Sequence, residues 1–217
     1  KFSNIDAMKF VHCDAQNYSF DGNYFDKVIS RFGVMFFENP SEAFKNILGS
    51  IQTNGSLNFV CWTNMMENEF ITEGMDVITK YTQKVLPEVT KDPGPFAFSD
   101  REYVNEVLQS AGFKNINIDK VYTSISTKDS AEQDAELLMG IGPRARILSE
   151  ENLSSEKMSM IKSEIIQLCE KRQIGLKKCK KIICSVFLGS PRQMRLSYLF
   201  RITLKRKSRP ISVYIWS

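Results

Sequence analysis

The sequence is poor in the residues that hold metal ions. It has a single histidine, His12, and its five cysteines follow no regular spacing. Neither a C-x-x-C pair nor a zinc-ligand set is present, so we predict no metal site. An odd number of scattered cysteines favours free thiols over a disulfide framework, which in turn predicts a reducing, cytoplasmic location.

Long apolar runs are absent as well. No stretch approaches the about 18 apolar residues of a membrane span, and residues 1–20 contain Asp6 and Asp14 but no apolar signal-peptide region. The chain has 217 residues, of which 42% are hydrophobic and 25% charged, a composition typical of a globular domain with a sizeable core. We therefore predict one domain, residues 1–190, followed by an appended segment.

Acidic residues are missing from that last segment. Residues 191–217 contain seven basic residues and no acidic one, which leaves 22 basic against 25 acidic residues in the remainder. The net charge of +4 thus reflects a basic C-terminal extension, and the body shows no sign of binding nucleic acid. The extension is open to three interpretations: a loosely packed tail, a segment not native to the domain, such as the product of a shifted reading frame, and an arm for nucleic acid or an anionic membrane. The sequence does not indicate an oligomeric state.

The body is predicted to alternate strands and helices. Apolar or alternating runs predict five strands, at residues 8–13, 26–32, 56–62, 114–126 and 180–189. Amphipathic periodicity predicts five helices, at residues 39–51, 68–86, 99–112, 131–148 and 154–172. This order predicts an α/β fold with a doubly wound, mostly parallel sheet.

Capping residues support several of these helix ends. Asn39 suits an N-cap and Pro40 the first helical position. Ser99 and Glu102 have the spacing of a capping box, and Gly112 is placed to end the same helix.

Polar residues follow two of the predicted strands, at the sheet edge where ligands bind in such folds. Asp14 comes directly after residues 8–13, and its carboxylate could accept a hydrogen bond from an exocyclic amine while a backbone N–H meets a ring nitrogen, as adenine requires. The alternative is that Asp14 caps a turn. Arg31 ends the next strand and could instead form a surface ion pair, and Phe32 could be a core residue. Gly33 would permit close approach of the backbone to a ligand.

Several stretches taken together resemble one family. They are DAQNYSF (14–20), FDKVISRFGVMFFENPSEAF (25–44) and NGSLNFVCW (54–62). They resemble the second half of a class I S-adenosylmethionine-dependent methyltransferase, and more closely the branch that includes quinone-type and other small-molecule methyltransferases. DPGPFAFSDREYVNEVLQSAGFKNINI (92–118) is similar to the later helix and strand of the same group. The resemblance covers about Met8 to Gly189.

The resemblance implies S-adenosylmethionine as the cofactor and a role for five residues. Asp14 and Ala15 would lie at the adenine. Ser30, Arg31 and Phe32 would lie at the methionine end.

The resemblance also implies a substrate side. A helical insertion before the last strand, residues 123–179, would form a lid over a small-molecule acceptor. Phe96 and Phe98 are candidates for the substrate pocket, with anchoring of their loop as the alternative. No catalytic residue is assigned, because methyl transfer from a sulfonium needs alignment more than proton transfer, and His12 lies within a predicted strand, where a core role is favoured.

The sequence departs from the family at its start. The family has a glycine-rich loop after its first strand and an acidic residue after its second, and neither precedes Asp14 here. We therefore expect a fragment, in which the N-terminal strands of the sheet are missing and which is weakly active or inactive as a methyltransferase. The alternative is a non-catalytic remnant or interaction module with a methyltransferase-like fold. A nicotinamide-dependent oxidoreductase is ranked last, because Tyr81 and Lys84 lie in a predicted helix without a partner signal.

Overall fold

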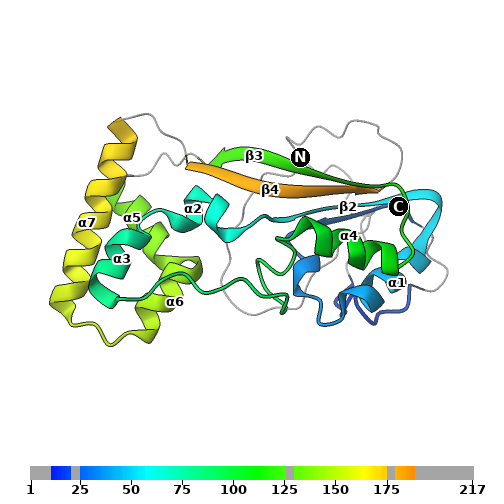
Figure 1. Cartoon of the computed structure of the whole chain (residues 1–217), viewed down its shortest axis with the longest axis horizontal. Helices are drawn as coiled ribbons and strands as arrows, with labels where there is room; N and C mark the ends of the chain where they lie inside the picture. The colour runs from blue at the N-terminus through cyan, green and yellow to red at the C-terminus, as the bar shows by residue number, and fades with distance from the viewer. Residues whose placement is uncertain (1–10, 21–24, 126–129, 175–178, 189–217) are drawn as a thin grey trace. The chain divides into compact units, whose positions relative to one another are not determined.

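The computed structural model describes residues 11–20, 25–125, 130–174 and 179–188 (Figure 1). The chain divides into two compact units. The sheet unit contains the described residues within 11–63, 90–121 and 183–188, and the helical unit contains those within 64–89 and 122–182. The predicted extension 191–217 lies outside the described residues.

The described strands form one sheet in the order β1-β2-β4-β3. Their bounds are Phe25–Arg31 for β1, Ile51–Trp62 for β2, Ile116–Ile125 for β3 and Cys179–Leu188 for β4. β1 and β2 are parallel, with Val28 opposite Leu57 and Arg31 opposite Val60, whereas β4 runs antiparallel to β2. The predicted α/β class with a parallel sheet is confirmed, and the antiparallel strand is the last one along the described chain.

The start of β2 contains an irregularity that one glycine makes possible. The register shifts between Phe25 and Lys27, which pair with Ile51 and Ser56. A Cβ on Gly55 would lie 2.5 Å from the Ile51 side chain and 2.8 Å from the Phe25 carbonyl oxygen. The strand can therefore pass so close to β1 only without a side chain at this position.

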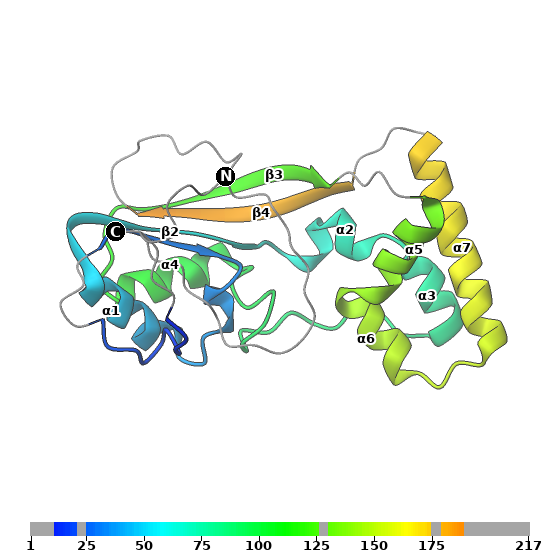
Figure 2. The same ribbon diagram turned by 180° about the vertical axis from the view of Figure 1, so that it is seen from behind.

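Helix α1, Pro40–Ser50, packs against the sheet through an aromatic core. It begins as predicted, because the side chain of Asn39 accepts a hydrogen bond from the Glu42 amide and Pro40 takes the first turn. Phe44 is fully buried and its ring stacks with Phe59 of β2 at a centroid distance of 5.6 Å. In both Figure 1 and Figure 2, α1 and α4 cover the same face of the sheet.

Helix α4, Arg101–Ser110, begins one residue later than the capping-box prediction implied. Its N-cap is Asp100, whose side chain accepts hydrogen bonds from the amides of Glu102 and Tyr103. A carboxylate is at least as good an N-cap as a serine hydroxyl, which explains why Asp100 rather than Ser99 takes this place. Gly112 follows the helix with a φ of 99°, as predicted for a helix stop.

The helical unit contains more breaks than the periodicity predicted. Its helices are η3 Met65–Glu67, α2 Glu69–Thr72, α3 Met75–Thr82, α5 Ala131–Gly140, α6 Gly142–Glu150 and α7 Ser155–Ile174. The single helix predicted for residues 68–86 is interrupted at Gly74, where φ is 77°, and the one predicted for 131–148 is interrupted before Gly142, where φ is 66°. Positive φ values end a right-handed helix, and glycine adopts them at little cost. None of the described helices is long and apolar enough to cross a membrane.

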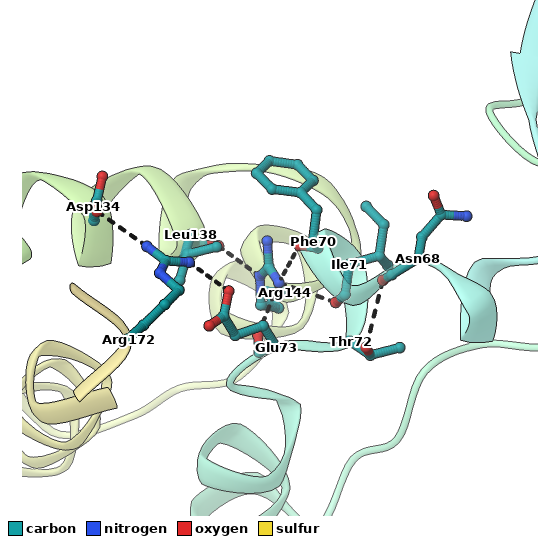
Figure 3. Close-up of polar contacts among 9 residues, drawn as sticks. All are labelled: Asn68, Phe70, Ile71, Thr72, Glu73, Asp134, Leu138, Arg144 and Arg172. Carbon is teal, nitrogen blue, oxygen red and sulfur yellow. Dashed lines mark hydrogen bonds and ion pairs between the residues drawn. The ribbon is translucent and has the colours of Figure 1, made fainter. Parts of the chain in front are cut away.

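A buried arginine connects three of these helices (Figure 3). Arg144 of α6 is fully buried. Its Nε donates to the carbonyl of Leu138 in α5 at 2.7 Å, and its Nη1 donates to carbonyls of residues 70, 71 and 73 around the end of α2 at 2.8–3.0 Å. Nearby, Arg172 of α7 bridges Glu73 and Asp134 at 2.6 and 3.0 Å. The helices of this unit are thus joined by Arg144, which satisfies carbonyls at helix ends, and by Arg172, which pairs with two carboxylates.

Candidate functional site

The carboxyl ends of β1 and β2 lie at the same edge of the sheet, because the two strands are parallel and in register. β1 ends at Arg31 and β2 at Trp62. Such an edge is where ligands bind in open α/β sheets. Of the residues assigned here by resemblance, Ser30 is half-buried and opposite Phe59 in the register, and Arg31 is exposed.

The chain leaves β1 through a residue with an unusual backbone. Phe32 has a φ of 57°, and its amide donates to the carbonyl of Val60 at 2.9 Å. Gly33, the residue that the sequence suggested for close approach, has an ordinary φ of −105°. The left-handed conformation, which a bulky residue rarely adopts, therefore falls on the aromatic residue and not on the glycine.

Three half-buried aromatic residues gather at this edge, and we refer to Phe32, Trp62 and Phe96 as the aromatic cluster. The rings of Phe32 and Trp62 are stacked, with centroids 4.9 Å apart and an interplanar angle of 22°. The ring of Phe96 lies 6.4 Å from Trp62 at 45°. Sequence reasoning missed Trp62, although its position directly after the apolar run of β2 mirrors that of Arg31 after β1.

The loop that carries Phe96 is fixed to both strands' ends. The Gly94 amide donates to the carbonyl of Met35 at 3.0 Å, and Met35 belongs to η2, the short helix Val34–Phe36 that follows β1. The thiol of Cys61 donates to the carbonyl of Phe98 at 3.5 Å. Phe98 itself is only 1% exposed and its ring contacts those of core residues such as Phe44. These contacts favour the alternative in which Phe98 anchors its loop, whereas Phe96 remains at the edge.

Asp14 begins a turn instead of ending a strand. Val11–Cys13 are not in a strand, and the rest of the predicted strand lies outside the described residues. The Asp14 carbonyl accepts from the amides of Asn17 and Tyr18, and its two carboxylate oxygens accept from the Gln16 amide and the Asn17 side chain, each at 2.9 Å. The side chain is exposed, and a carboxylate that accepts two hydrogen bonds retains further lone pairs for a ligand.

The turn is held against α1. Ala15 is buried, and its carbonyl and that of Tyr18 both accept from the Asn46 side chain, at 3.2 and 2.9 Å. The side-chain oxygen of Gln16 accepts from the amide of Asn39, the N-cap of α1, at 2.9 Å. Next to the turn, burial and the Asp14 carboxylate raise the pKa of the Cys13 thiol. The positions of Asp14 and Ala15 are thus set by polar side chains of Asn46 and Gln16 that carried no pattern in the sequence.

The described residues do not assemble a metal-binding group. Among them, no three His, Cys, Asp or Glu side chains are placed to hold a metal ion. Of the five cysteines, Cys13, Cys61 and Cys169 have described side chains, and none of these three is in a disulfide.

Comparisons with known proteins point to one family. Residues 1–59 match the family model described as a methyltransferase domain. A demethylmenaquinone methyltransferase of Clavibacter sepedonicus is 27% identical over 110 residues, which are 51% of this chain and 43% of that protein. The chain thus spans less than half the length of this curated relative.

Solved structures are also similar, at a lower level. One is a phosphoethanolamine N-methyltransferase 2 of Haemonchus contortus in complex with phosphomonomethylethanolamine and S-adenosylhomocysteine, with 15% identity, a TM-score of 0.39, and coverage of 83% of this chain and 37% of that one. Another is the YcgJ protein of Bacillus subtilis, with 10% identity, a TM-score of 0.39, and coverage of 82% and 69%. Scores below 0.5 do not define a common fold, so the fold of this chain rests on its own strand order and register.

Proposed function

We propose that this chain, which is related to the class I S-adenosylmethionine-dependent methyltransferases, binds S-adenosylmethionine and transfers its methyl group to a small-molecule acceptor. The observation that carries the proposal is the match of residues 1–59 to a methyltransferase domain. That segment contains the Asp14 turn, the parallel strand β1 and the whole of α1. The proposal therefore concerns the edge of the sheet that these elements build.

The described residues fit the two ends of the cofactor. The exposed carboxylate of Asp14 has acceptor capacity left for the adenine amine, beside the buried Ala15. Ser30, Arg31 and Phe32 follow one another at the end of β1, where the methionine end is assigned by resemblance. Both groups belong to the sheet unit.

The chemistry needs few side chains. When bound, S-adenosylmethionine would supply a methyl group on a positively charged sulfur for transfer to a lone pair of the acceptor, and the sulfur would leave as a neutral thioether that keeps the carbon–sulfur electron pair. The protein contributes by aligning the acceptor and by excluding water. Phe96 is the described residue that we assign to the acceptor side, and residues 123–179 are proposed to act as a lid.

Isothermal titration of the chain with S-adenosylmethionine and S-adenosylhomocysteine tests the proposal. We expect both ligands to bind, and we expect Asp14→Asn to weaken binding by at least about tenfold, because a hydrogen bond to a charged group contributes roughly 1.5–3 kcal/mol. Asp26→Asn is the matched control, since Asp26 is also exposed but lies within β1, and it should bind like the wild type.

The possible negative results separate two parts of the proposal. If neither ligand binds the wild type, the proposed function is wrong and a non-catalytic module with this fold is favoured. If both bind and Asp14→Asn has no effect, cofactor binding stands and the role of Asp14 is restricted to its turn.

A further inference from the structure

Phe32 has a strained backbone conformation that the sequence did not predict. A residue other than glycine at a φ of 57° adopts a conformation that costs energy, and such residues occur preferentially at functional sites. Gly33 directly follows and could have taken the strained position at lower cost. The structure instead holds Phe32 there, with its amide bonded to Val60 and its ring stacked on Trp62.

The aromatic cluster is assembled from three separate segments. Phe32 follows β1, Trp62 ends β2, and Phe96 comes from a loop that is bonded to η2 and to β2 through Gly94 and Phe98. All three side chains are half-buried, so part of their surface is accessible at the carboxyl edge of the parallel pair. An apolar wall alone could be made from aliphatic residues in relaxed conformations. Aromatic rings add a face with negative electrostatic potential.

We infer that the aromatic cluster binds the positively charged sulfonium end of S-adenosylmethionine, an inference that rests on the proposed function. Ligand cations are attracted to the faces of aromatic rings, and tryptophan gives the strongest interaction. The cluster contains Phe32, one of the residues at which the methionine end of the cofactor is proposed. Trp62 thereby becomes a cofactor-binding residue in addition to those assigned by resemblance, and the cluster favours the charged cofactor over its neutral product.

Comparing ligands that differ in charge tests this role. Dissociation constants are measured by titration for S-adenosylmethionine, for neutral S-adenosylhomocysteine, and for sinefungin, in which an amine that is protonated at neutral pH replaces the sulfonium. We expect the wild type to bind the two cations about fivefold more tightly than the neutral product, from the usual strength of a cation–aromatic contact. Trp62→Leu should make the three dissociation constants similar. Trp62→Phe, which retains a ring, should keep most of the preference for the two cations.

A second variant and a control cover the case in which Trp62→Leu fails to fold. Phe32→Leu removes the ring that stacks on Trp62 but retains an apolar side chain. It should also reduce the preference for cations. Tyr122→Leu is the control, because Tyr122 is 64% exposed and lies outside the cluster, and it should leave all three constants unchanged. Far-UV circular dichroism shows which variants are folded.

The outcomes distinguish failure of this inference from failure of the proposed function on which it rests. Binding of S-adenosylhomocysteine without any preference for cations overturns the inference and leaves the proposed function intact. A preference for cations that persists in folded Trp62→Leu and Phe32→Leu also overturns the inference and leaves the proposed function intact. In that case an apolar acceptor becomes the favoured occupant of the cluster. Absence of binding for every ligand overturns both.

Discussion

Replacing Arg144 by methionine should strongly destabilise the helical unit. The side chain is fully buried, and its Nε and Nη1 donate to four carbonyls at distances of 2.7–3.0 Å. Methionine has a comparable length but no donor, so these carbonyls would lose a charged partner. Each unsatisfied buried acceptor costs about 1–3 kcal/mol. Part of this loss is offset, because the variant no longer has to desolvate a guanidinium on folding. We therefore expect the free energy of unfolding to fall by about 3–5 kcal/mol, the usual cost of removing one partner from a buried charged network.

The same helix offers a matched control. Arg146 is two residues away in α6, its side chain is 75% exposed, and it pairs with Glu150 at 2.7 Å. Arg146→Met should change the free energy of unfolding by less than about 0.5 kcal/mol, because exposed ion pairs contribute little. Arg144→Lys should recover only part of the loss, since a lysine ammonium lacks the planar fork of donors that reaches both α5 and the end of α2.

Urea unfolding followed by circular dichroism measures these differences, and limited proteolysis locates them. Cleavage in Arg144→Met should increase within residues 64–89 and 122–182, which form the helical unit. If Arg144→Met and Arg146→Met unfold within about 0.5 kcal/mol of each other, the buried hydrogen bonds do not carry the stability assigned to them here.

Two further predictions concern Cys169 and Gly55. Burial raises the pKa of the Cys169 thiol from its usual 9.0 to about 11. Above pH 9 the unfolded state loses this proton while the folded state retains it, so the contribution of the thiol to the free energy of unfolding is complete below pH 9 and is lost as the pH rises. Between pH 8 and 10 the wild type should lose about 1 kcal/mol more than Cys169→Ala in urea titrations, and equal losses would show that burial of the thiol has no such effect. Gly55→Ala should lower the free energy of unfolding by about 1–3 kcal/mol, because the new Cβ would lie 2.8 Å from the Phe25 carbonyl. Gly49→Ala in α1, where the added Cβ would meet no atom within 4 Å apart from its chain neighbours and the backbone of its own helix, should stabilise by about 0.5–1 kcal/mol; a loss for both substitutions would contradict the steric explanation.

Much of the fold follows from local patterns. The apolar strand segments of β1 and β2, the N-cap of α1 at Asn39 and the stop at Gly112 were all evident from residue type and spacing, since each depends on groups within a few residues. The breaks at Gly74 and before Gly142 were not, because an apolar stripe at helical spacing continues across them. Arg144 shows the physical reason: its fully buried side chain contacts carbonyls of residues more than 70 positions away in the sequence, and no local window contains that information.

The candidate site was predicted in outline but not in its contacts. The carboxyl edge of β1 could be located from the apolar run that precedes it, and with it Ser30, Arg31 and Phe32. Periodicity says nothing of which residue after a strand takes the left-handed conformation, and the sequence suggested only that Gly33 would permit close approach of the backbone to a ligand. Phe32 takes it because the stack with Trp62 and the hydrogen bond to Val60 come from β2, which follows about thirty residues later.

Helix α1 is the element that relates the two predicted ends of the cofactor site. It connects the end of β1 to the start of β2, so its length and its packing through Phe44 constrain the register in which the two strands meet. The same helix holds the Asp14 turn through the Asn46 side chain and through the Asn39 amide. A substitution that shifts α1 should therefore displace the adenine end and the aromatic cluster together. Loss of binding in such a variant identifies α1 as a scaffold, whereas the ligand-charge comparison at Trp62 reports on direct contact.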